Sequence, residues 1–276
     1  MTNEERRAAQ RATSEARKRE VVLDSLSHRR KLVHAECHIG KVESLLTKWG
    51  SNGYRIFEQT DSEGERQLCC EMLKPLPDEL GLVIGDALQA LRNSLDNLAF
   101  ALSKANTPSL TPEQEENVSF PILRRSTPIE TGNRGISHMS HAAKAEICAV
   151  TPHPTRDQLD QHPLWLLNKT ANRDKHREIP TALAAFAHRE TVIGMPGESG
   201  YIDYFREMGN RPLQMGGPQI IAVWGPKTTL KPHVRTGVDV IFDKGIEVEN
   251  RVIVPTLREF YDHIRDTVFK RLEPLL

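Results

Sequence analysis

Residues 168–179, NKTANRDKHREI, concentrate the side chains that could do chemistry. Six of the twelve are charged, and His176 adds an imidazole, the natural proton shuttle near neutral pH. On a helix, four residues would share one face at spacings of 3, 4 and 4: Trp165, Asn168, Asn172 and His176. Arginine and lysine beside a histidine can hold a phosphate or a carboxylate. The residues expected to orient a substrate here are Asn172, Asp174, Lys175 and Arg177.

The alternative for this segment is an ordinary solvated helix face. Asp174 and Arg177 are three residues apart, close enough on a helix to pair with each other. A tryptophan, two amides and a histidine on one face are nevertheless an unusual choice for solvation alone. The composition of the face therefore indicates the polar half of a site or of a polar network.

A second polar cluster lies beside a leucine-rich seam at residues 84–102. Arg92 and Asp96 are four residues apart, the spacing of an intrahelical ion pair that stabilises by roughly 0.3–0.5 kcal/mol. Asn93 and Asn97 fall on another face together with Asp86. The simplest interpretation is an ion pair with solvated neighbours, and the functional one is a phosphate contact through Arg92.

The sequence gives little support for a metal-binding motif or for a catalytic nucleophile. In HAECH, residues 34–38, the two histidines are four apart, but the zincin motif HExxH has its glutamate directly after the first histidine. His34, Cys37 and His38 lack an obvious remote ligand, and the set of His138, His141 and Cys148 lies on a short segment. There is no GxSxG elbow or cysteine signature. We expect no metal, no other cofactor, and reduced thiols at all four cysteines.

The overall composition narrows the class of protein. The chain has 276 residues, 27% of them charged, with a formal net charge of zero, which argues against bulk duplex DNA or an anionic membrane as partner. No apolar run approaches the ~18 residues of a membrane span. The first twenty residues lack the apolar core of a signal peptide, so a cytoplasmic protein is expected.

The periodicity of apolar residues predicts the elements that position these clusters. Ile84, Leu88, Leu91, Leu95, Leu98 and Leu102 form a heptad-like seam, which predicts a helix over 80–105 packed along its whole length. Further helices are predicted at 4–48, 138–149, 162–177 and from Pro180 through Ala187, with an amphipathic helix at the C-terminus. Segments 54–60 and 66–73 predict a β-hairpin. TVIGM, PQIIAVWG, HVRTGVDVIF and NRVIVP predict strands.

The pattern is that of an α+β fold: a helical bundle-like half, an antiparallel β-sheet and a C-terminal helix. We expect a mainly helical region at 1–188, with residues 106–137 as a long irregular connection, and a region of strands plus the last helix at 189–276. The two are expected to pack as one domain.

Three motifs occur in one order: GDALQALRNSLDNLAFAL at 85–102, SFPIL at 119–123 and LWLLNKTANRDKHR at 164–177. They resemble a largely uncharacterised bacterial family with the patterns L-R-x-x-L-D-H-L, F-P-I and L-x-x-N-x-D-K-H-R. The first motif also resembles the R-x(4–6)-H signature of the HEPN helical superfamily, many of whose members are metal-independent ribonucleases. In those enzymes, the resemblance implies, arginine steadies the scissile phosphate, histidine helps activate the ribose 2′-hydroxyl, and two protomers complete one site.

Arg92 and Asn93 fit the start of that signature, but Asn97 stands where the pattern has histidine. An amide cannot exchange a proton near pH 7. Either the catalytic role is lost or His176 performs it, which requires the helices at 84–102 and 162–177 to pack side by side.

Three hypotheses follow. The first is a cytoplasmic, homodimeric HEPN-like protein that binds RNA or cleaves it without metal through Arg92 and His176, leaving a 2′,3′-cyclic phosphate and sparing DNA. Asn93 and Asn97 join the expected substrate-binding residues in that case. The second is a non-catalytic binding or structural module in which Arg92, Asp174 and His176 belong to a buried polar network. The third is an unrelated enzyme using His176 with Asp96 and Asp174.

Overall fold

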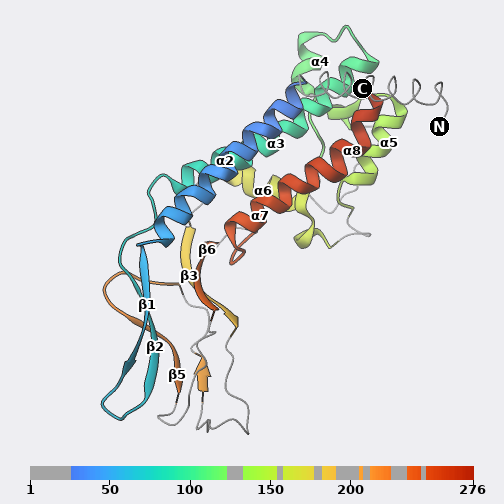
Figure 1. Ribbon diagram of the computed structural model, residues 1–276. Helices are drawn as coiled ribbons and strands as arrows, with labels where there is room; N and C mark the ends of the chain where they lie inside the picture. Colours follow the sequence, from blue (N-terminus) through green and yellow to red (C-terminus); the bar gives the residue numbers. More distant parts are fainter. Residues whose placement is uncertain are drawn as a thin grey trace, which may run out of the picture. The chain divides into compact units, whose positions relative to one another are not determined.

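The computed structural model describes residues 26–122, 133–153, 158–176, 182–190, 205–207, 212–224, 235–243 and 247–276, with side chains throughout except at 173–176, 182–190, 205–207 and 235–237. It is an α+β structure, as the sequence predicts (Figure 1). The contacts group the chain into two compact units, within residues 1–39, 85–177 and 257–276 and within 40–84 and 178–256. This grouping differs from the sequence-based division at residue 188, because each unit is assembled from segments distant along the chain.

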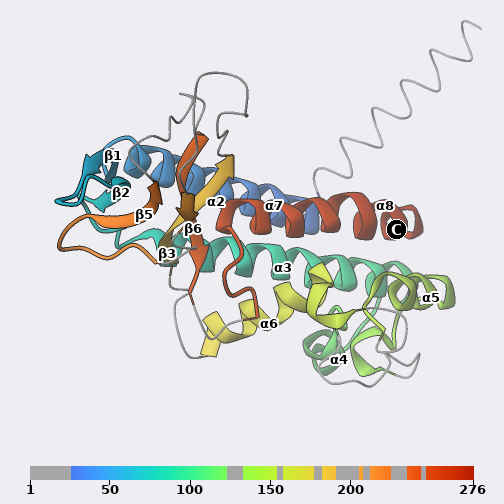
Figure 2. The same cartoon turned by 90° about the horizontal axis from the view of Figure 1, so that it is seen from below.

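The first unit is built around the predicted leucine-seam helix, α3 (Leu80–Asn106). All six seam residues are at most 2% exposed, which confirms that this helix packs along its length. The helices that flank α3 are α2 (Ser27–Gly50), α6 (Pro163–His176) and the helix formed by α7 and α8 (Figure 2). α2 ends at Gly50, where the sequence predicts the stop; the predicted residues 4–25 of this helix lie outside the described residues.

The C-terminal helix forms as predicted but is not uniform. It consists of α7 (Ile253–His263), a π-helical stretch (Ile264–Phe269), α8 (Lys270–Leu272) and a closing 3₁₀ turn (Glu273–Leu275). The apolar stripe of the sequence faces inward, and its members are buried: Leu257, Phe260, Tyr261, Ile264, Val268 and Leu272. A π-helical insertion leaves no simple mark in a 3.6-residue periodicity.

Short helices complete the first unit. α5 (His141–Val150) confirms the predicted helix, and Ser140 caps it by accepting a hydrogen bond from the Ala143 N–H. α4 (Pro112–Asn117) and a 3₁₀ turn (Arg134–Ile136) interrupt the stretch predicted to be irregular. A second 3₁₀ turn (Leu159–Gln161) precedes α6.

The second unit holds two antiparallel sheets. One has the strand order β1-β2-β5-β4, and the other pairs β3 with β6. The strands are β1 (Tyr54–Thr60), β2 (Arg66–Met72), β3 (Ala182–Glu190), β4 (Phe205–Glu207), β5 (Gln219–Trp224) and β6 (Arg235–Phe242). The predicted hairpin is confirmed as β1–β2, and a bulge between Leu68 and Cys69 shifts its register against β5.

Two predictions of local structure were wrong. The helical turn expected through Ala187 is instead strand β3, whose alanine-rich backbone pairs with β6 from Ala182 opposite Phe242 onward. Tertiary pairing thus overrides the helical preference of alanine. NRVIVP is not a strand: Val252 makes one isolated bridge to Ile241, and α7 begins at the next residue. The strand predicted at TVIGM lies outside the described residues.

None of the helices in the described part of the chain is long and apolar enough to cross a membrane.

Candidate functional site

The polar edge of α3 carries the ion pair that the sequence predicts. Arg92 Nη1 lies 2.9 Å from Asp96 Oδ1, one turn along the helix. The leucine seam faces the core, so these two residues lie at its margin: the Arg92 side chain is 17% exposed and that of Asp96 is 35% exposed. The pair is therefore better shielded from water than a typical surface pair.

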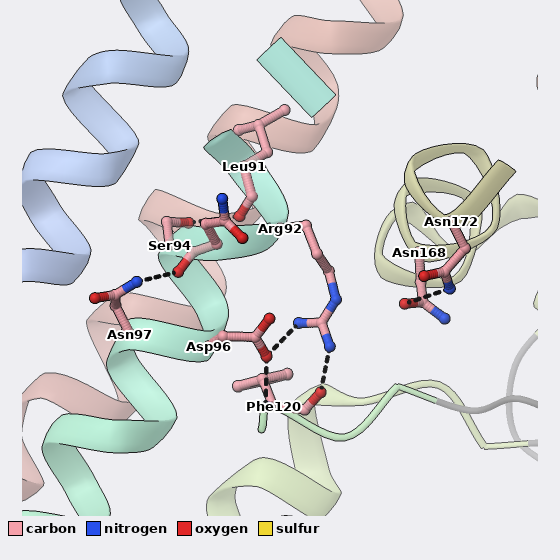
Figure 3. A network of polar contacts seen from close by, with 9 residues as sticks. Leu91, Arg92, Ser94, Asp96, Asn97, Phe120, Asn168 and Asn172 are labelled. Atoms are coloured by element: carbon pink, nitrogen blue, oxygen red, sulfur yellow. Dashed lines mark hydrogen bonds and ion pairs between the residues drawn. The ribbon is translucent and has the colours of Figure 1, made fainter. Parts of the chain in front are cut away.

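Both members of the pair also bind the backbone of one residue, Phe120. Arg92 Nη2 donates to the Phe120 carbonyl oxygen at 2.9 Å, and the Phe120 N–H donates to Asp96 Oδ1 at 2.9 Å (Figure 3). A guanidinium and a carboxylate one turn apart thus satisfy the acceptor and the donor of the same residue. We call Arg92, Asp96 and the Phe120 backbone the Phe120 latch.

The latch holds an apolar segment in the core. The Phe120 side chain is 1% exposed and that of Ile122 is 7% exposed. An extended segment entering a core must pair its backbone groups, because an unpaired buried N–H or C=O costs about 1–3 kcal/mol. Two motifs that seemed independent in the sequence, the Arg92 helix and SFPIL, are therefore parts of one contact.

The third motif also packs against the Arg92 helix. Gln89 Nε2 donates to the Ala171 carbonyl oxygen at 2.7 Å, so α3 and α6 lie side by side, as the His176 hypothesis requires. On α6, Asn172 Nδ2 donates to Asn168 Oδ1 at 3.2 Å, and Asn168 is only 5% exposed. Figure 3 shows these two amides across from the Arg92 side chain.

The two signature positions of α3 do not converge. Residues five apart on an α-helix are separated by about 140° around its axis. Asn97 accordingly points to the opposite side of α3 from Arg92 (Figure 3), and its Nδ2 donates to the Asn93 carbonyl oxygen at 2.8 Å. Asn93 itself is exposed. Asn97 therefore lies on another face of α3 than Arg92, and the substrate-binding roles of Asn93 and Asn97 stay predictions.

The structure describes the remaining predicted site residues only in part. His176 is the last residue of α6, and Asp174 and Lys175 precede it in the same helix. The side chains of Asp174, Lys175 and His176, and all of Arg177, lie outside the described residues. Their predicted roles stay predictions. Asn172 is exposed at the described end of the helix.

Among the residues that the structure describes, no three histidine, cysteine, aspartate or glutamate side chains gather as a metal site. Cys69 and Cys70 are both buried, and burial raises the pKa of the Cys70 thiol to about 11, helped by its neighbour Cys69. A thiol with so high a pKa is a poor nucleophile at neutral pH.

Sequence reasoning missed the partner of the Arg92–Asp96 pair. The i,i+4 spacing predicts the pair, but the Phe120 peptide lies 24 and 28 residues away and a backbone group leaves no trace in the sequence. It also missed Gln89 as the residue that joins α3 to α6. The local signal for this contact was the amide of Gln89 itself, a hydrogen-bonding side chain within an apolar helix.

No protein-family model, curated protein or solved structure matches this chain.

Proposed function

We propose that the first unit, which we call the helical unit, is a non-catalytic interaction module related to the HEPN-like helical class. In this module Arg92 has a structural role. The observation that carries the proposal is the Phe120 latch. Arg92 uses one terminal nitrogen for Asp96 and the other for the Phe120 carbonyl oxygen. Its function is to fix the SFPI segment on α3, and with it the surface formed by α3, α6 and that segment.

A phosphate contact at Arg92 would conflict with these bonds. A scissile phosphate would have to share the guanidinium with a carboxylate 2.9 Å away, which would repel it, and with the Phe120 carbonyl oxygen. The signature residue that should exchange a proton is the amide of Asn97, which lies on the opposite side of the helix. Both features favour a module without catalysis.

A metal-independent ribonuclease is the second candidate, and one observation favours it. The contact between Gln89 and Ala171 brings α6 against α3. At a rise of 1.5 Å per residue, Arg92 is displaced by about 4.5 Å from Gln89 along α3, and His176 by about 7.5 Å from Ala171 along α6. The two helices run antiparallel (Figure 2), so these displacements point in opposite directions, and the candidate needs a substrate that spans both residues. In this candidate His176 is the general acid or base, and the ribose 2′-hydroxyl is the nucleophile.

Incubation with labelled single-stranded RNA in EDTA separates the two candidates. The proteins compared are the wild type, His176→Ala, Arg92→Ala and, as a matched control, His138→Ala. We expect no cleavage by any of them and a lower unfolding temperature for Arg92→Ala alone. Cleavage by the wild type that is lost in His176→Ala and kept in His138→Ala, with a 2′,3′-cyclic phosphate product, would overturn the non-catalytic proposal.

The same proposal includes two further properties of the module: it binds RNA without cleaving it, and it associates with a second copy of itself. RNA retention that weakens steeply with added salt would support a phosphate-contacting surface, because such contacts release counterions. A homodimer is what the HEPN resemblance implies, and sedimentation of the full chain gives its mass directly. If the mass is that of a monomer, the homodimer is contradicted, and with it a site shared between two copies of the chain.

A further inference from the structure

Two histidines on the solvent side of α2 aim the same ring atom at each other. His34 and His38 are one helical turn apart, and their Nε2 atoms are 3.3 Å apart. The rings are nearly perpendicular, at 88°, with centroids 4.5 Å apart. His34 is exposed and the His38 side chain is 20% exposed, so the pair is open to solvent.

The separation of the two nitrogens matches the span between two ligands of one metal ion. Histidine nitrogens bind zinc at about 2.0–2.1 Å, and tetrahedral geometry then places two of them about 3.3 Å apart. Histidines at positions i and i+4 of a helix are also the arrangement that zincins use for two of their ligands. The backbone of α2 therefore presents both nitrogens at a spacing that one ion can bridge.

A second observation, from another helix, points the same way. The other ring nitrogen of His38, Nδ1, lies 3.9 Å from Oδ2 of Asp86 on α3. Metal-binding histidines usually turn their second nitrogen toward a carboxylate, which fixes the tautomer and makes the ligating nitrogen more basic. Asp86 is placed to favour the His38 tautomer that carries its proton on Nδ1 and its lone pair on Nε2.

The glutamate between the histidines takes no part in this arrangement. Glu36 accepts a hydrogen bond from the Tyr261 hydroxyl at 3.1 Å and pairs with Arg258 at 3.6 Å. Glu36 is thus engaged by residues of the C-terminal helix and is not among the proposed ligands. The ligands are the two imidazoles alone.

We propose that His34 and His38 bind a divalent transition-metal ion through their Nε2 atoms, with Asp86 as the carboxylate behind His38. Zinc, copper(II) and nickel(II) are the ions that favour imidazole ligands. No third side chain of the described residues completes the group, so water fills the remaining coordination positions. The site is open, and it does not depend on the proposed function of the Phe120 latch.

Calorimetric titration of the untagged full-length protein with zinc chloride tests the proposal. We expect one ion per chain with a Kd of about 1–100 μM, weaker than the four-ligand structural sites of zinc fingers. His34→Ala and His38→Ala should each weaken binding by about 100-fold or more. Asp86→Asn should weaken it by about 10-fold to 100-fold, the range for residues that orient a ligand.

Two control variants make the result decisive. His141→Ala removes an exposed histidine elsewhere in the same unit, and Cys37→Ser removes the exposed thiol next to His38. Both should bind zinc as the wild type does, and all five variants should keep the helical circular dichroism of the wild type. Absence of binding by the wild type would leave the 3.3 Å contact as a hydrogen bond between the two imidazoles and overturn the proposal. Binding that survives both histidine substitutions, or that is lost in Cys37→Ser, would overturn it as well.

Discussion

Two arginine–carboxylate clusters tie distant segments together in the helical unit, and they do so differently. The Phe120 latch joins α3 to an extended segment through backbone groups. The second cluster, the Glu273 clasp, joins the start of α2 to the C-terminus through side chains only. Arg29 donates to both Glu273 oxygens at 2.7 Å, and His28 Nε2 lies 3.0 Å from Oε1.

The burial of the carboxylate is the main difference. The Glu273 side chain is 8% exposed, whereas that of Asp96 is 35% exposed. Burial alone would raise the pKa of Glu273, but the hydrogen bonds and charges of Arg29 and His28 outweigh it and lower the pKa to about 2. In the clasp, the attraction between opposite charges is the main contribution to the free energy of unfolding. In the latch, the main contribution is the pairing of the backbone N–H and C=O of Phe120.

The largest effect is expected from breaking the clasp. Glu273→Ala leaves His28, which is fully buried, and the partly buried Arg29 without their carboxylate. Loss of one member of a buried pair costs about 3 kcal/mol of unfolding free energy, and urea denaturation measures it. A loss below about 1 kcal/mol would show that the clasp is no stronger than a surface pair.

The pH dependence of stability follows from the same group. Because the pKa of Glu273 falls from its ordinary 4.5 to about 2 in the folded state, its contribution is complete above pH 4.5 and is lost as pH falls toward 2. A shift of this size corresponds to about 3 kcal/mol. Unfolding free energies at pH 6 and pH 3 should differ less in Glu273→Ala than in the wild type. Equal acid sensitivity of the two proteins would contradict this assignment.

A smaller effect is expected from removing the arginine of the latch. Arg92→Ala leaves the Phe120 carbonyl oxygen unpaired and removes the partner of Asp96, at a cost of about 2 kcal/mol. Asp96 is exposed enough for water to offset part of the loss. The comparison variant is Arg55→Ala, which removes an exposed ion pair between Arg55 on β1 and Glu71 on β2. Loss of this pair should cost less than about 1 kcal/mol, and the urea midpoints of the two variants measure the difference.

The smallest effect is expected from neutralising the latch carboxylate. In Asp96→Asn the amide oxygen can still accept from the Phe120 N–H, so only the charge is lost, and the cost should be about 1 kcal/mol or less. The thermal unfolding temperatures of Asp96→Asn and Glu273→Gln compare the loss of charge at the latch with the same loss at the clasp, and the drop should be larger for Glu273→Gln. If both changes cost the same, burial does not separate the two clusters.

Much of the fold follows from local pattern, and the exceptions have physical causes. The α3 seam is predictable because its apolar spacing is helical from Ile84 to Leu102, and the β1–β2 hairpin because two strand-like segments flank a turn. Strand β3 is not predictable from its alanines, since only its pairing with β6 makes it a strand. The helix α4 did carry a local signal, the capping box formed by Thr111 and Gln114.

The candidate site divides in the same way. The Arg92–Asp96 pair and the shared face of His34 and His38 follow from i,i+4 spacing. The Phe120 peptide, Asp86 beside His38, and Glu273, 245 residues from His28, depend on tertiary packing that spacing does not encode. The sequence therefore indicated which side chains can form ion pairs or bind a metal, and only the structure shows which groups each of them contacts.

The most direct test of the latch is a double-mutant cycle on Arg92 and Asp96, with urea unfolding free energies for the wild type, Arg92→Ala, Asp96→Ala and the double variant. If both residues hold the Phe120 backbone and pair with each other, their effects are not additive, and we predict a coupling energy of about 1 kcal/mol or more. A coupling energy near zero, with Arg92→Ala as stable as the wild type, would contradict a structural role for Arg92 and return it to the candidates for phosphate binding.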